Sequence, residues 1–145
     1  GMQHLFGNAY AVRRSDFTKN RATLIRYFRA MAKGTVFAHA NPEASVKLAW
    51  EVFPETKPKG LTEADAMVAA MKIVNARKDK WLPGSWAPDK RWGAMTKEEW
   101  AAQVKFAGLE GRVKDVEKYW TNELIDEVNK FDAKAIADKA RSFKI

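Results

Sequence analysis

The stretch that decides the fold is NRATLIRYFRAMAKGTVFAHANPEASVKLAWEVF, which spans residues 20–53. Its first half repeats apolar or weakly polar residues at intervals of three and four, the period of a helix with one buried face. These residues are Leu24, Ile25, Phe28, Met31, Ala32, Thr35 and Val36. We therefore expect one amphipathic helix that ends at Ala40.

A second helix is predicted directly after the first, at Asn41 and Pro42. Asn is a favoured N-cap, and Pro at the first helical position gives up only an amide that has no helical partner. Glu43 adds negative charge at the positive end of the helix dipole. We expect the two helices to form an αα unit. The residues predicted on the buried face of the second helix are Val46, Ala49, Trp50 and Phe53.

Residues 5–12, LFGNAYAV, are short, apolar and aromatic, a pattern that predicts a strand. A strand needs a partner, and no later segment has convincing strand character. We therefore expect it to pair with another molecule or with a sheet that this chain lacks. The rest of the sequence indicates helices. Their expected caps are Thr62, Thr96 with Glu99, Thr121 and Asp132. The predicted fold class is mainly α with one short N-terminal strand.

The chain carries a formal charge of +8 at pH 7, which raises the question of whether it binds nucleic acid. Phosphate binding needs such charge clustered on one face. Here Lys and Arg are interleaved with acids, as in VKDVEK and DAKAIADKAR, and the densest groups are residues 13–14 and 57–59. We expect a solvated basic surface and no nucleic-acid partner.

The sequence gives no sign of converging catalytic groups. Its two His residues are His4 and His39, and His39 is expected to serve as a cap or dipole partner at a helix end. The HExxH, GxSxG, P-loop and GxGxxG patterns do not occur, and Cys is absent. Asp126 and Glu127 are adjacent on a helix and therefore face different directions. We expect neither an enzyme nor a bound metal or cofactor.

The segment at residues 80–93, KWLPGSWAPDKRWG, contains three of the six Trp residues, at Trp81, Trp86 and Trp92. Its Pro and Gly residues exclude a regular helix or a central strand. One interpretation is a loop that its indoles pin across the helices. The other is an aromatic wall of a ligand pocket or a partner surface, because Trp is common at both kinds of site.

Several stretches together resemble one family. They are GNAYAVRRSDF (residues 7–17), RAMAKGTVFAHANPEASVKLAW (29–50), NARKDKW (75–81), WGAMTKEEWAAQVKFAGLEGRV (92–113) and YWTNELIDEVNKFD (119–132). The family comprises the periplasmic substrate-binding proteins of ABC importers of the sulfonate, nitrate and thiamine-precursor type. The resemblance is to the C-terminal part of such proteins, and it covers residues 7–143.

Members of that family have two α/β lobes that close over a small molecule and deliver it to a membrane permease. The resemblance implies that residues 1–145 are a single incomplete domain, the C-terminal helical portion of the two-lobed fold. It also implies a small anionic or heterocyclic ligand in the parent protein, an ABC permease as partner and a periplasmic location. GMQHLFGNAY lacks the features of a signal peptide, so the chain as it stands is expected in the cytoplasm.

The resemblance and the residue chemistry point to Asn8, Tyr10 and Trp86 as ligand-binding residues. An amide and a phenol can hydrogen-bond an anionic head, and an indole can stack on a ring. The alternative is a stand-alone helical module without ligand-binding activity. Such a module docks a protein partner, or a second copy of itself, through its Trp-rich segment.

Overall fold

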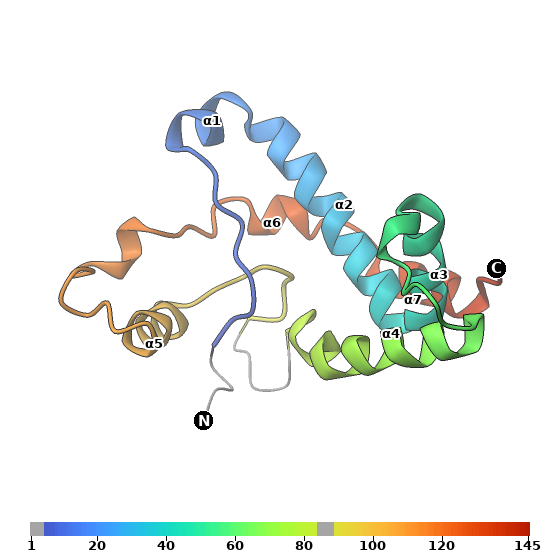
Figure 1. Cartoon of the computed structure of the whole chain (residues 1–145). Coiled ribbons are helices and arrows are strands. Elements are labelled where there is room, and N and C mark those ends of the chain that lie inside the picture. Colours follow the sequence, from blue (N-terminus) through green and yellow to red (C-terminus); the bar gives the residue numbers. More distant parts are fainter. Residues whose placement is uncertain (1–4, 84–88) are drawn as a thin grey trace.

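A computed structural model describes residues 5–83 and 89–145 and shows a mainly helical chain (Figure 1). Its first half contains α1 (Arg14–Lys19), α2 (Arg21–Ala40), α3 (Pro42–Val52) and α4 (Glu63–Arg77). Its second half contains α5 (Lys97–Phe106), α6 (Ile125–Val128) and α7 (Ala133–Ser142). Short 3₁₀ turns occur at η1 (Pro54–Thr56), η2 (Lys78–Lys80) and η3 (Val116–Lys118).

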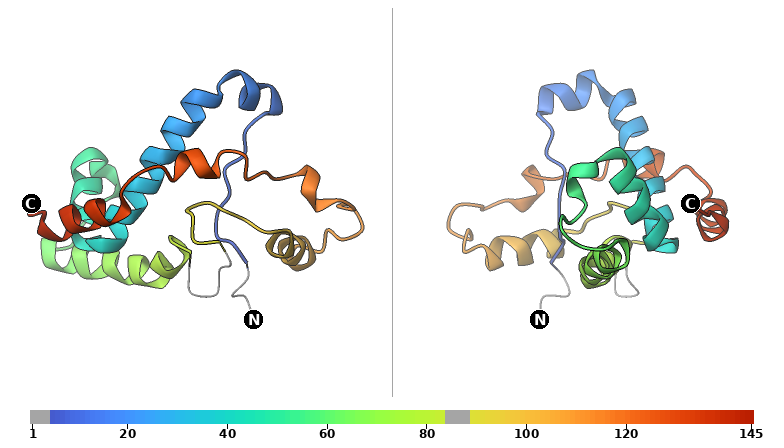
Figure 2. Two further views of the ribbon diagram at one scale, coloured as in Figure 1. Left: turned by 180° about the vertical axis from the view of Figure 1, so that it is seen from behind. Right: turned by 45° about the vertical axis from the view of Figure 1, so that its right-hand side comes forward.

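The long helix α2 is the axis of the molecule. α3, α6 and α7 pack against it, and α4 packs against α3. Figures 1 and 2 show α3, α4 and α7 gathered at one end of the molecule, with α5 standing apart on the other side. Residues 5–13 run as an extended segment between α2 and α5, so this segment connects the two sides of the molecule.

The core lies where α6 meets the middle of α2. Ala32 of α2 is fully buried there against Leu124 and Val128. The apolar period of the first predicted helix therefore faces this core, as expected, and the two-helix unit of residues 20–53 is confirmed. The half-buried apolar residues packed around the core are Phe17, Leu24, Ile25, Phe28, Trp92 and Phe131.

Asn41 joins three helices at the corner between α2 and α3. Its side-chain oxygen accepts a hydrogen bond from the Ala44 amide at 3.1 Å, which caps α3 as predicted. Its side-chain nitrogen donates to the Ala140 carbonyl at 2.8 Å, near the end of α7. One amide thus satisfies a free donor of α3 and gives the Ala140 carbonyl, which also accepts from the Phe143 amide, a second hydrogen bond.

The other predicted caps have mixed outcomes. Thr62 and Asp132 cap α4 and α7, and Thr96 with Glu99 forms the full capping box of α5. Thr121 does not cap a helix: its hydroxyl accepts from the Glu123 amide at 3.1 Å, and α6 begins only at Ile125.

The predicted strand at residues 5–12 is wrong, because the described part of the chain contains no strand. The segment is extended, but its aromatic side chains pack on α2 and α5 in place of a ladder with a neighbour. Ala49 and Phe53 were also expected to be buried, but Ala49 is exposed and Phe53 is 55% exposed. α3 ends one residue before it, so Phe53 falls outside the helical period that buries Val46.

The chain exposes more surface than a compact monomer of its mass. Its accessible surface is 10308 Å², whereas a compact monomer of 16.5 kDa exposes about 7,500 Å². Among the described residues, Val128 is the one large side chain that is fully buried. The fold therefore depends on a small core and on specific side-chain hydrogen bonds around it.

Replacing Asn41 with Ala removes both the cap of α3 and the bond to α7. We expect the free energy of unfolding to fall by about 2 kcal/mol, the sum of a lost cap and a lost half-buried hydrogen bond. Urea unfolding followed by circular dichroism measures this loss. Asn20→Ala is the matched control, because Asn20 precedes α2 without a side-chain cap bond. Equal losses in the two variants would contradict the role of Asn41.

Candidate ligand-binding cavity

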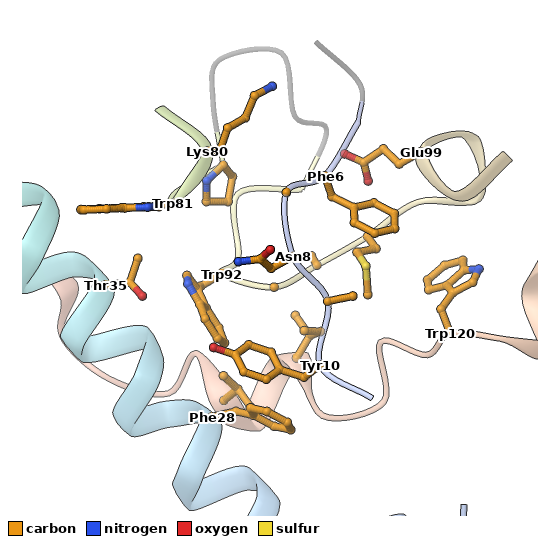
Figure 3. A pocket seen from close by; sticks show the side chains of 18 of the residues that line it. Phe6, Asn8, Tyr10, Phe28, Thr35, Lys80, Trp81, Trp92, Glu99 and Trp120 are labelled. Carbon is orange, nitrogen blue, oxygen red and sulfur yellow. The ribbon is translucent and has the colours of Figure 1, made fainter. Parts of the chain in front are cut away.

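A cavity of about 640 Å³ lies where the N-terminal segment crosses the molecule (Figure 3). Its walls come from residues 5–12, the middle of α2, residues 80–83, residues 92–95 and residues 119–128. The volume is within the range of small-molecule sites. Nine of its thirty lining residues are aromatic, and they are Phe6, Tyr10, Phe17, Phe28, Trp81, Trp92, Trp100, Tyr119 and Trp120.

Ring contacts fix the N-terminal segment across this cavity. The Tyr10 ring lies 5.1 Å from Phe28 on α2 and 6.3 Å from Trp92, measured between ring centroids. Four residues earlier, the Phe6 ring lies 4.9 Å from Trp100 on α5. Tilted aromatic pairs at these separations are favourable beyond their buried area. The segment is therefore positioned by side chains, which explains why it needs no strand partner.

Polar groups gather at one part of the cavity. Figure 3 shows the Asn8 amide and the indole nitrogens of Trp81 and Trp92 turned toward the same space, with Thr35 of α2 across from them. The Thr35 hydroxyl donates to the Met31 carbonyl at 2.9 Å. An indole N–H is a donor only, and an amide offers both donor and acceptor. This part of the cavity suits the oxygen atoms of a ligand.

Three buried polar atoms near α5 have no protein partner. They are the indole nitrogens of Trp100 and Trp120, two residues that line the cavity, and the side-chain oxygen of Gln103, which does not line it. A buried donor without an acceptor costs about 1–3 kcal/mol. Their burial therefore costs stability on this side of the fold.

Two side-chain amides hold the wall formed by residues 92–95. Asn129 accepts from the Trp92 amide at 2.8 Å and donates to the Trp92 carbonyl at 3.1 Å. Asn122 makes the same reciprocal pair with Met95, at 3.2 Å and 2.9 Å. Between them, Gly93 has φ +80°, and a Cβ there would meet Ile125 Cδ1 at 3.5 Å. The two Asn side chains thus hydrogen-bond the backbone of residues 92–95 as a neighbouring strand would.

Charge at the edge of this wall is balanced internally. Asp89 lines the cavity, and Arg91 Nε donates to its carboxylate at 2.9 Å while the same guanidinium also bonds Asp126. The hydrogen bond from Arg91 lowers the pKa of Asp89 below its ordinary value. The carboxylate is therefore charged at neutral pH and already paired, which leaves the cavity without an unmatched negative charge from this residue.

The structure brings together two of the three residues predicted to bind a ligand. Asn8 and Tyr10 both line the cavity, and Tyr10 is 52% exposed. Trp86 lies outside the described residues. The sequence alone did not single out Asn122 and Asn129. They lie on either side of the four-residue helix α6 (Ile125–Val128), so no helical period marks them as a pair.

Within residues 5–83 and 89–145, no group of three or more His, Asp or Glu side chains is placed to hold a metal ion. In the same ranges, no helix combines the length and the apolar character that crossing a membrane requires.

Comparisons of the chain with protein-family profiles, with curated proteins and with solved structures find no match.

Replacing Asn129 with Ala removes the two bonds to Trp92 and a third to the Ile125 carbonyl. We expect a loss of about 2–3 kcal/mol in the free energy of unfolding, because the Trp92 backbone groups lose their partner. Urea unfolding measures it. Asn75→Ala on exposed α4 is the control and should change stability little. A loss no larger than the control's would show that Asn129 does not hold the wall.

The fall of the melting temperature at low pH should depend on Asp89. Its pKa in the folded chain is below the ordinary 3.8, so its charge stabilises the fold above about pH 4 and that contribution disappears as the pH falls through the folded pKa. Asp89→Asn should therefore flatten the fall of the melting temperature between about pH 5 and about pH 2. Asp79→Asn, at an exposed site, is the control. An unchanged slope in Asp89→Asn would contradict the pairing.

Proposed function

We propose that this chain is a non-catalytic solute-binding component, the C-terminal part of a periplasmic substrate-binding protein of an ABC importer. Its aromatic cavity holds the small ligand, and the partner to which the ligand is delivered is an ABC permease. The observation that carries the proposal is that Asn8 and Tyr10, chosen from the sequence, line one cavity whose walls hold eight further aromatic residues.

The lining suits a planar or anionic solute. Tyr10, Phe28 and Trp92 offer ring faces for stacking, and Asn8 offers hydrogen bonds beside them. Arg77 also lines the cavity, and the chain as a whole carries +8. Net positive charge draws small anions toward the protein. A ring or an anionic head such as a sulfonate or nitrate fits these features.

The acidic residues of the lining are committed to structure, which supports binding without catalysis. Asp89 is paired with Arg91, and Glu99 accepts from the Thr96 amide at 2.8 Å as part of the α5 capping box. A general acid or base must have a proton to give or a lone pair to use near the substrate. Both carboxylates are already used in holding the walls.

Calorimetric titration with nitrate, ethanesulfonate, benzenesulfonate and 4-amino-2-methylpyrimidine tests the proposal. We expect benzenesulfonate to bind more tightly than ethanesulfonate, because only its ring can stack. Tyr10→Ala should weaken benzenesulfonate binding about fivefold, the value of one aromatic contact.

Phe106→Ala is the matched control, since Phe106 on α5 is 65% exposed and does not line the cavity. Its affinity for benzenesulfonate should equal that of the unchanged chain. No heat from any of the four probes, or an affinity that Tyr10→Ala leaves unchanged, would contradict the proposed site.

A further inference from the structure

One wall of the cavity carries an uncompensated positive charge. Arg77, the last residue of α4, lines the cavity and is exposed. Among residues 5–83 and 89–145, no carboxylate pairs with its guanidinium and no acceptor bonds it. Lys80 lines the cavity from the same stretch of chain but already has an interaction partner. The charge and the five donors of Arg77 are therefore available to a ligand.

The opposite wall carries a negative charge. Figure 3 shows Glu99 of α5 on the side of the cavity away from Trp81 and Thr35. Its carboxylate accepts from the Thr96 amide at 2.8 Å, and no cation pairs with it in the part of the chain that the structure describes. A hydrogen bond from an amide favours the charged form of a carboxylate. An anion is therefore attracted to the α4 side of the cavity and repelled from the α5 side.

Hydrogen-bond donors lie on the positive side. Trp81 follows α4 through η2, and its amide donates to the Lys78 carbonyl at 3.0 Å, so a continuous turn connects Arg77 and Trp81. The indole nitrogens of Trp81 and Trp92 face the same space as the Asn8 amide (Figure 3). An indole N–H donates and cannot accept, and a guanidinium bonds two oxygens of one anionic group. These groups together suit a ligand end that accepts hydrogen bonds.

We propose that Arg77 is the specificity-determining residue of the cavity and that the ligand is an aromatic anion. The anionic group lies at the α4 wall, beside Arg77 and the Trp81 indole, and the ring stacks on the aromatic side chains around Tyr10. This inference rests on the proposed solute-binding function, and it adds the class of ligand and the direction in which the ligand lies. A small inorganic anion lacks the ring and a neutral aromatic lacks the charge, so both bind more weakly.

Calorimetric titration of the full chain at pH 7 with benzenesulfonate and with benzenesulfonamide, its neutral analogue of similar shape, tests the role of charge. We expect benzenesulfonate to bind about tenfold more tightly, the value of one charge-assisted hydrogen bond at an exposed site. Arg77→Gln should bring this ratio of affinities close to one by weakening benzenesulfonate alone. Arg77→Lys keeps the charge without the planar fork and should leave a ratio of about three.

Arg112→Gln is the matched control. Arg112 is exposed and does not line the cavity, and its replacement lowers the net charge of the chain by the same amount. Its ratio should equal that of the unchanged chain, which separates a contact in the cavity from long-range attraction. Circular dichroism and thermal unfolding verify that each variant folds. A role of Arg77 limited to the dipole of α4 would lower the melting temperature and leave the ratio unchanged, and that result would overturn the inference.

Two further outcomes separate this inference from the proposed function. Equal affinities of the unchanged chain for the two probes, both weakened by Tyr10→Ala, would overturn the role of Arg77 and retain the solute site. A ratio that Arg77→Gln and Arg112→Gln lower equally would also overturn it, because net charge alone would then explain the preference. Absence of binding by both probes would overturn the solute site and the inference together.

Discussion

The reciprocal hydrogen bonds from Asn122 and Asn129 are the constraint on which the rest of this structure depends. They attach residues 92–95, which have no helix or strand of their own, to the chain around α6. That attachment puts Trp92 against the core and against Tyr10. Without it, the cavity would lose a wall and the N-terminal segment would lose one of its anchors. These side-chain amides make the backbone hydrogen bonds that a neighbouring strand would make in a sheet.

Helices were predictable because their signals are local. The apolar period of residues 20–40, the cap at Asn41 and the capping box at Thr96 each depend on residues within a few positions of one another. The strand was not predictable in this way. Residues 5–12 are aromatic and apolar, which suits both a strand and a segment that lines a cavity. Which of the two forms depends on Phe28 and Trp100. These residues are distant in the sequence, and their rings pack against Tyr10 and Phe6 of the segment.

The candidate site was predictable only in part. Asn8 and Tyr10 came from a family resemblance and from their chemistry, and the structure places both at one cavity. The amides that build its wall were not found, because Asn122 and Asn129 lie outside the short helix α6 and form no local pattern. Their role appears only with the backbone of Trp92 and Met95 opposite them. The second bond of Asn41, to α7, was hidden for the same reason.

We propose that the cavity lined by Tyr10, Phe28 and Trp92 binds a small solute. Isotope-filtered nuclear Overhauser spectroscopy of the labelled chain with unlabelled benzenesulfonate is the decisive measurement. We expect contacts from the ring protons of the probe to those three side chains. Contacts confined to exposed rings outside the cavity, such as Phe106, or no contacts at saturating probe, would contradict it.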